Sequence, residues 1–244
     1  MLARRIEEAS LNAWPALQQL LYDGWIVRLA NGYTKRANSV TPLYPTVLGL
    51  DEKVAYCEGL YRDRGLAPIF RLTSLACPPG LDDALSDRGY RTVDPTLVLH
   101  LDLAAGALPA PHEPLCHASP EEGLHLYTRL SGAGPENEAK HAEILRAMVP
   151  ARLLATLAGA GGDPVACGLA VLEGDLVGLF DLVTAPTQRR RGHGTALVAG
   201  MLQWARGAGA RHAYLQVVRD NAPARGLYGR LGFRKVYHYW YRVP

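Results

Sequence analysis

Three consecutive arginines and two glycines occupy residues 189–194, within the stretch QRRRGHGTAL at 188–197. A helix-forming run follows the glycines directly, so the stretch is predicted to end in a helix N-terminus. The first turn of a helix carries unpaired backbone N–H groups and a partial positive charge, and both attract anions. Glycines at 192 and 194 leave no β-carbon between a phosphate and the backbone. The stretch indicates a phosphate site, with a solvated basic turn as the alternative.

A second group of candidate residues lies in DNAPARGLYGRLGF at 220–233. Asn221 and Tyr228 are seven residues apart, about two helical turns, and therefore lie near one face of a predicted helix. Asn221 is also a favourable N-cap. A tyrosine beside a phosphate loop can act as a general acid, and a structural aromatic is the alternative. Other phosphate loops fit less well, since a Gly-Lys-Ser/Thr ending is absent and Leu197 replaces the third glycine of a dinucleotide loop.

Predicted strands and helices alternate around these motifs. We expect strands at 151–157, 165–172, 176–184, 213–218 and 233–243, and helices at 135–148, 194–206 and 222–231. This order predicts the α/β class, with α+β character and a mixed central sheet. The phosphate loop then joins the strand at 176–184 to the helix that follows it.

The first part of the chain repeats the pattern of the second. At an offset of 143 residues, the Gly-Tyr-Arg at 89–91 aligns with the Gly-Phe-Arg at 232–234, each between a short helix and a final strand. A helix at 51–65 likewise precedes a strand at 68–72. We infer two copies of one fold, at 1–103 and 115–244, joined by a proline-rich linker at 104–114. The alternative is two unrelated α/β segments with a chance match.

Together the two motifs resemble those of the GCN5-related N-acetyltransferase (GNAT) superfamily. Its pyrophosphate motif, Arg/Gln-x-x-Gly-x-Gly/Ala, corresponds to residues 189–194, and its motif Asn-x-x-Ala-x-x-Leu-Tyr-x-x-Leu-Gly-Phe corresponds to residues 221–233. The resemblance covers about residues 115–244. It implies a two-domain, tandem GNAT-like fold, acetyl-CoA as the donor, and a primary amine of a small molecule or peptide as the acceptor.

The resemblance also implies roles for individual residues. The pantetheine arm of CoA would bind the strand end at Leu182, Val183 and Thr184, together with Asn221 and Ala224. Tyr228 would contact the cofactor and protonate the leaving thiolate, and no metal is needed. The contacts to the pyrophosphate would come from Arg189, Arg190, Arg191, Gly192, His193, Gly194 and Thr195.

The general base is expected on the strand before the loop, where Asp181 is the one carboxylate. An Asp flanked by apolar residues can take a proton from an ammonium group, and a satisfied structural Asp is an equal alternative. Glu173 is a poorer candidate because it lies in a predicted turn. The alternating tyrosines of the tail (237, 239 and 241) are expected in the core or on an acceptor pocket. The polar run at 33–43 either faces the cleft, with Thr34, Arg36, Asn38 and Ser39, or forms a hydrogen-bonded hairpin.

The first copy lacks the chemistry of the second. At the same offset Thr46 replaces Arg189, Pro78 replaces Asn221 and Leu85 replaces Tyr228. Asp51 and Glu52 stand at the start of its first helix, where carboxylates would repel phosphate. We therefore expect a degenerate copy that supports the second and walls the acceptor cleft.

Composition limits the remaining possibilities. The chain has 244 residues and a formal net charge of +3, which suits a phosphorylated ligand and does not demand a nucleic-acid partner. It has no apolar run near the ~20 residues that cross a bilayer, and Glu7 and Glu8 stand where a signal peptide is apolar. Four widely spaced cysteines indicate buried thiols. We expect a cytoplasmic N-acetyltransferase, compatible with a homodimer; the alternative is a non-catalytic acyl-CoA-binding regulatory protein.

Overall fold

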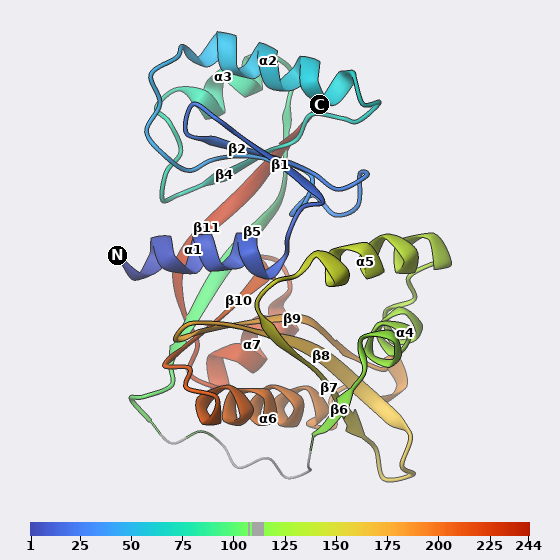
Figure 1. Cartoon of the computed structure of the whole chain (residues 1–244). Coiled ribbons are helices and arrows are strands. Elements are labelled where there is room, and N and C mark those ends of the chain that lie inside the picture. Colours follow the sequence, from blue (N-terminus) through green and yellow to red (C-terminus); the bar gives the residue numbers. More distant parts are fainter. Residues whose placement is uncertain (107, 109–114) are drawn as a thin grey trace.

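A single mixed sheet runs through the whole molecule. The computed structural model describes residues 1–106, 108 and 115–244, so the predicted linker lies mostly outside the described residues. Eleven strands of the described residues join in the order β1-β2-β3-β4-β11-β5-β10-β9-β8-β7-β6 (Figure 1). Their bounds are β1 Gln18–Tyr22, β2 Trp25–Leu29, β3 Val40–Pro42, β4 Phe70–Thr73, β5 Arg91–Asp102, β6 Cys116–Ala118, β7 Ala151–Ala158, β8 Pro164–Glu173, β9 Leu176–Thr184, β10 His212–Val218 and β11 Arg234–Val243.

Helices cover both faces of this sheet. They are α1 Leu2–Ala13, α2 Leu50–Arg62, α3 Leu81–Asp87, α4 Pro120–Ser131, α5 Pro135–Ala147, α6 His193–Gly207 and α7 Ala222–Arg230, with a short 3₁₀ turn at Pro186–Gln188. In the C-terminal half, α6 buries Leu197, Met201 and Leu202 in a core on one face. Helices α1, α4 and α5 cover a second core on the other face. The predicted helices and strands of this half and its mixed sheet are confirmed.

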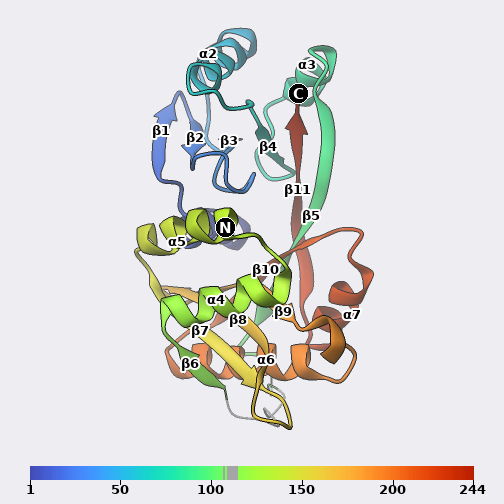
Figure 2. The same cartoon turned by 90° about the vertical axis from the view of Figure 1, so that its right-hand side faces the viewer.

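The final strands of the two halves are exchanged. Strand β5, at the end of the first half, pairs antiparallel with β10 of the second, from His212 opposite Asp102 to Val218 opposite Thr96. Strand β11, at the end of the second half, pairs antiparallel with β4 of the first. The two exchanged strands also pair with each other and stand side by side between the halves (Figure 2). Each half therefore completes its sheet with a strand from the other.

Both halves contain a strand, a helix and a second strand parallel to the first. In the C-terminal half these are β9, α6 and β10, and in the N-terminal half β3, α2 and β4. The N-terminal unit has its own core, in which Trp25, Phe70 and Leu81 are fully buried. This common order agrees with the repeat seen in the sequence.

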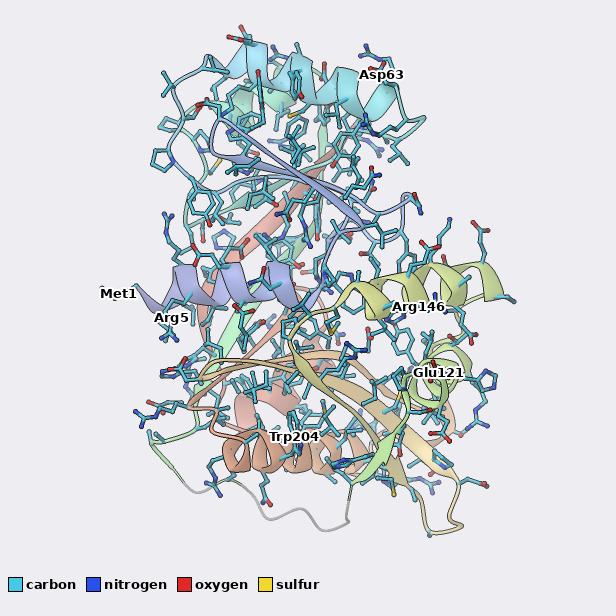
Figure 3. The ribbon with its side chains drawn as sticks, viewed as in Figure 1. Met1, Arg5, Asp63, Glu121, Arg146 and Trp204 are labelled. Atoms are coloured by element: carbon cyan, nitrogen blue, oxygen red, sulfur yellow. The ribbon has the colours of Figure 1, made fainter. Side chains whose placement is uncertain are left out.

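Helix α1, which the sequence pattern did not predict, connects the halves. Its Arg5, labelled in Figure 3, forms an ion pair with Asp175 in the turn between β8 and β9. Its Glu7 is fully buried, pairs with Arg71 of β4 and accepts a 2.5 Å hydrogen bond from the Tyr237 hydroxyl of β11. Because this buried carboxylate bonds to both partners, it holds α1 against β4 of the N-terminal half and against β11, the strand exchanged from the C-terminal half.

The four cysteines differ in their exposure to solvent. All four thiols are free, but only Cys57 and Cys167 are buried; Cys116 is exposed and Cys77 intermediate, so the prediction of four buried thiols is wrong. Cys116 lies on the outermost strand β6, where one edge of the sheet faces outward. Within the described ranges, every helix is too short or too polar to cross a membrane.

Candidate functional site

Strands β9 and β10 separate part-way along their length. They pair in parallel from Leu176 opposite His212 to Leu179 opposite Leu215, and the described pairing stops there. Strand β9 nevertheless continues to Thr184, paired only with β8 on its other side. The backbone groups of 180–184 that face β10 are therefore available to an added strand-like ligand.

A bulge at Asp181 lies just beyond the separation. The register of β8 against β9 shifts between Cys167 and Leu169, so that Gly168 opposes both Asp181 and Leu182. Asp181 has a φ of +50°, in the left-handed region. A β-carbon on Gly168 would lie 2.7 Å from Leu182 Cδ2 and 3.0 Å from Met201 Sδ. The bulge therefore needs glycine opposite it, and it re-aims the side chains at 181 and 182.

The loop after β9 presents unpaired amides and unpaired charge. Within the described chain, the backbone N–H groups of 189–194 have no hydrogen-bond partner, and the N-cap of α6, Gly192, offers no side-chain cap. Gly192 has a φ of +90° with open space around its missing β-carbon, and Arg190 has a φ of +63°. No described carboxylate pairs with the three arginines. These features suit a bound anion.

Gly194 has a different structural reason from the one expected. A β-carbon there would lie 3.1 Å from Leu227 Cδ1 and 3.5 Å from Thr184 Oγ1. The glycine therefore allows α6 to start close to α7 and to the end of β9. The Arg189 side chain adds a 3.4 Å hydrogen bond from its Nε to the Thr184 carbonyl oxygen. The loop is held at the open end of the strand separation.

Helix α7 carries the second motif. Asn221 is its N-cap, since its side-chain oxygen accepts a 3.2 Å hydrogen bond from the Ala224 amide. Tyr228 packs edge-on against Phe233, with ring centroids 6.0 Å apart. Burial raises the pKa of Tyr228 to about 12. No described group bonds to its hydroxyl, so the phenol keeps its proton and has it available for a ligand.

A cavity of about 590 Å³ brings most of these residues together. Of the predicted site residues, those lining it are Asp181, Leu182, Val183, Asn221, Ala224 and Tyr228. Thr184 and the loop residues 189–195 lie outside its lining, beside the end of β9. The N-terminal half contributes Tyr33, Thr34, Lys35 and Arg36 to the wall. The cavity therefore spans the strand separation and the junction of the two halves.

Asp181 has a neighbour that sequence reasoning missed. His141 of α5 is buried, and its Nε2 lies 3.0 Å from Asp181 Oδ2, although off the direction of a hydrogen bond. Three aromatic rings, those of Trp14, Tyr33 and Tyr127, have their centroids 5.0, 5.9 and 5.2 Å from the His141 ring. Nothing in the sequence indicated this contact, because the neighbours of His141 come from four separate segments of the chain.

Part of the polar run at 33–43 faces the cavity, and part lies in a hydrogen-bonded hairpin, so each expectation holds for some of its residues. Thr34 and Arg36 line the cavity, and the Thr34 hydroxyl accepts a 3.1 Å hydrogen bond from Trp14 Nε1. Asn38 and Ser39 are buried in the hairpin instead, where the Asn38 side chain accepts from the Ala30 amide at 2.9 Å.

The tyrosines of the tail satisfy both interpretations at once. All three are buried, and Tyr239 and Tyr241 also line the cavity. The Tyr239 hydroxyl donates a 3.0 Å hydrogen bond to Gln216 Oε1 of β10. Although burial would raise the pKa of Tyr239, the nearby guanidinium groups of Arg36 and Arg71 lower it. The Tyr239 hydroxyl therefore lies beside two cationic side chains.

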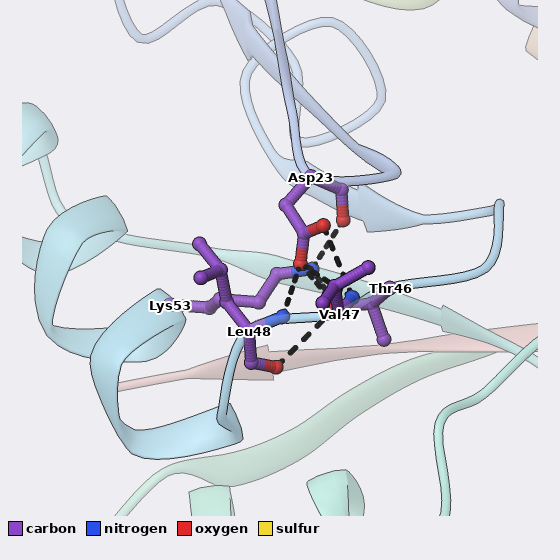
Figure 4. A network of polar contacts seen from close by, with 5 residues as sticks. All are labelled: Asp23, Thr46, Val47, Leu48 and Lys53. Atoms are coloured by element: carbon purple, nitrogen blue, oxygen red, sulfur yellow. Dashed lines mark hydrogen bonds and ion pairs between the residues drawn. The ribbon is translucent and has the colours of Figure 1, made fainter.

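The corresponding loop of the N-terminal half is filled from within. The Asp23 carboxylate accepts backbone hydrogen bonds from Val47 at 3.1 Å and Leu48 at 2.9 Å, and one from the Thr46 hydroxyl (Figure 4). The fully buried Lys53 lies 3.0 Å from the same carboxylate. The Thr46 hydroxyl first, then the Leu48 amide and Lys53, hold the pKa of Asp23 well below its usual range.

Asp23 therefore does what Asp51 and Glu52 were expected to do. Both of those acids are exposed, and Asp51 pairs with Arg88 at 2.7 Å. At an offset of 143, residues 46–53 correspond to residues 189–196. An internal carboxylate thus stands where the C-terminal loop is open to an external anion.

Comparison with known proteins agrees with this geometry. The family model described as "Probable histone acetyltransferase Rv0428c C-terminal" matches residues 3–242. The chain is 29% identical over 245 residues to "Uncharacterized N-acetyltransferase YobR" of Bacillus subtilis (strain 168), covering 98% of each chain.

Solved structures share the fold. A "GCN5-related N-acetyltransferase" from Kribbella flavida has a TM-score of 0.74 at 19% identity, over 99% of this chain and 95% of that one. Another from Sphaerobacter thermophilus has a TM-score of 0.69 at 18% identity, over 97% and 84%. A "Tandem GNAT protein from the clavulanic acid biosynthesis pathway" has a TM-score of 0.61 at 15% identity, over 80% and 69%.

Proposed function

Since this chain belongs to the GCN5-related N-acetyltransferase superfamily, within the acetyltransferase family whose model matches residues 3–242, we propose that it transfers an acetyl group from acetyl-CoA to a primary amine. The observation that carries the proposal is the open edge of β9, which leads from the cavity to the uncapped start of α6. It offers one continuous path for a strand-like arm and a diphosphate.

The residues along this path fit acetyl-CoA. The backbone of Leu182 to Thr184 would pair with the pantetheine arm, and Asn221 and Ala224 would flank it from α7. The free amides of 189–194 and the three unpaired arginines would hold the pyrophosphate. His193 would contribute its free backbone amide at the first turn of α6; the Thr195 amide, expected to do the same, already donates a 2.9 Å hydrogen bond to the Gly192 carbonyl oxygen.

Acetyl-CoA supplies a thioester whose carbonyl carbon is the electrophile. Asp181 would accept a proton from the incoming ammonium group, so that the free amine attacks directly. Backbone N–H groups on the open edge of β9 would donate to the carbonyl oxygen as it gains charge. The C–N bond forms, the C–S bond breaks, and the Tyr228 hydroxyl would give its proton to the leaving sulfur; the second proton, which the nitrogen loses as the amide forms, would restore the phenol. The products are an N-acetyl amide and free CoA.

The N-terminal half would act as a wall and not as a second transferase. Its loop already holds the Asp23 carboxylate against the amides that a phosphate would need, and Leu85 occupies the position of the general acid. Residues 33–36 from this half line the cavity, which supports a role in binding the acceptor.

The test is release of free thiol from acetyl-CoA in the presence of a panel of amines, with the acetylated product identified by mass. We expect release that depends on the amine. A protein that binds acetyl-CoA, seen by calorimetry or by thermal stabilisation, and releases no thiol with any amine would instead be a regulatory binder.

A further inference from the structure

The cavity holds four charged side chains, and two of them cancel. Lys35 and Asp94 form an ion pair at 2.9 Å, with both side chains substantially exposed. That leaves Arg36 and Asp181, which do not pair with each other. The cavity therefore presents one positive and one negative group to a ligand.

Arg36 lacks a carboxylate partner. No Asp or Glu oxygen of the described residues lies within 4.0 Å of its guanidinium, and its Nε is buried without a hydrogen-bond partner. Its Cζ lies 5.5 Å from the centroid of the Trp14 ring and 5.8 Å from that of Phe180, and the Tyr239 hydroxyl is its polar neighbour. A buried guanidinium without a counter-ion is costly, and a bound anion removes that cost.

Arg71 and Arg28 have partners for their terminal nitrogens, although the Nε of each is buried without one, as in Arg36. Arg71 pairs with the buried Glu7. Arg28 donates to the backbone carbonyls of Leu11, Trp14 and Arg36. Of these three guanidinium groups, that of Arg36 is the one that lines the cavity, and among the described residues it has neither a carboxylate nor a backbone carbonyl partner.

The positive and the negative group lie beside the same two aromatic residues, Phe180 and Tyr127. Asp181 follows Phe180 directly, and Arg36 lies against the Phe180 ring. Tyr127 feels both groups: burial and Asp181 raise its pKa, while Arg36 lowers it. The two charges therefore flank the same pair of aromatic rings.

We propose that the acceptor is a small amine that also carries a carboxylate, such as an amino acid, with its ammonium group toward Asp181 and its carboxylate on Arg36. This inference rests on the proposed acetyl transfer and specifies its substrate class. The transfer itself is unchanged: the C–N bond forms, the C–S bond breaks, and the ammonium proton goes to Asp181. Arg36 positions the acceptor through a charge-assisted, two-pronged contact.

The test compares each of the twenty common L-amino acids with its own carboxamide as acceptor. The carboxamide has the less basic amine, and so more of it is deprotonated at neutral pH; a preference for the acid cannot come from amine reactivity. We expect kcat/KM to be about tenfold or more higher for the preferred acid than for its carboxamide, the usual effect of one hydrogen-bonded charge. A ratio near one in the wild type, or a terminally blocked lysine peptide that serves as well as the best amino acid, would overturn the inference.

Substitutions of Arg36 test whether this residue causes the preference for the acid over the carboxamide. Arg36→Gln should bring the ratio of acid to carboxamide close to one while leaving the Kd for CoA unchanged. Arg36→Lys keeps a charge in the same place and should retain part of the preference, which guards against loss of folding in the first variant. Lys140→Gln removes a cation from α5, where it pairs with Glu136, and serves as the matched control. An unchanged ratio in folded Arg36→Gln would contradict the assignment.

Thermal stabilisation by the same ligands separates the two proposals. Stabilisation by an amino acid but not by its carboxamide, without thiol release, would mean that the carboxylate site exists and acetyl transfer does not. Thiol release with many amines and no carboxylate preference would leave the transferase in place and remove the inferred substrate class.

Discussion

Replacing Tyr228 by Phe removes one hydroxyl and leaves the ring that packs on Phe233. Burial raises the pKa of this phenol to about 12. A free thiol has a pKa near ~8.5, so full proton transfer to an exposed thiolate would be uphill by about 3.5 pKa units, or about 5 kcal/mol. Desolvation also raises the pKa of a thiol bound beside the phenol, so the difference between the two pKa values is smaller in the site.

These opposing effects set the expected size of the change. General acids contribute about 10²–10⁴-fold, and a hydrogen bond to a charged group contributes about 1.5–3 kcal/mol, or about 10–150-fold. We expect Tyr228→Phe to lower kcat by about 100-fold, where the two ranges meet. The Kd for acetyl-CoA should change little, because no described group depends on the hydroxyl.

The assay is steady-state thiol release combined with calorimetric titration of CoA. In the pH profile of the wild-type kcat, deprotonation of Tyr228 should cause no fall below about pH 11, since a pKa raised to about 12 keeps the phenol protonated there. A loss of kcat below about fivefold, or an equal loss of cofactor binding, would refute the reasoning about the acid.

Three further predictions concern the loop, the filled site and the exchanged strands. Gly192→Ala adds a β-carbon to a residue whose φ is left-handed. The conformational energy of the loop should rise by about 1–2 kcal/mol, which should weaken CoA binding; wild-type affinity by calorimetry would contradict this. Asp23 has a lowered pKa, so its stabilisation is present above about pH 4 and is lost as the pH falls further. Asp23→Asn should therefore show a smaller drop in urea midpoint between neutral and acidic pH than the wild type. A chain of residues 115–244 alone lacks β5, the strand between β10 and β11, and should show no cooperative thermal transition; a sharp melt would mean that the exchange is dispensable.

Local sequence was sufficient for most individual elements. The apolar period of residues 194–206 predicted α6, because one buried face imposes its own spacing on a helix, and the apolar run at 176–184, bounded by a turn, predicted β9. The glycine spacing of the loop and the N-cap at Asn221 were also visible, since both are short-range backbone requirements. The residues predicted to hold the cofactor were assigned from the resemblance of these two motifs to those of the GNAT superfamily.

The partners in the acceptor cavity were decided by the tertiary structure. His141 reaches Asp181 from α5, and Arg36 enters from the other half of the chain, contacts that no local period encodes. The exchange of β5 and β11 was likewise invisible, because each strand has the same alternation whichever neighbour it pairs with. Sequence alone therefore determined most of the elements and the loop proposed to bind the pyrophosphate, since both depend on short-range spacing. The charges that select the acceptor depend on long-range packing between the halves, which only the folded chain specifies.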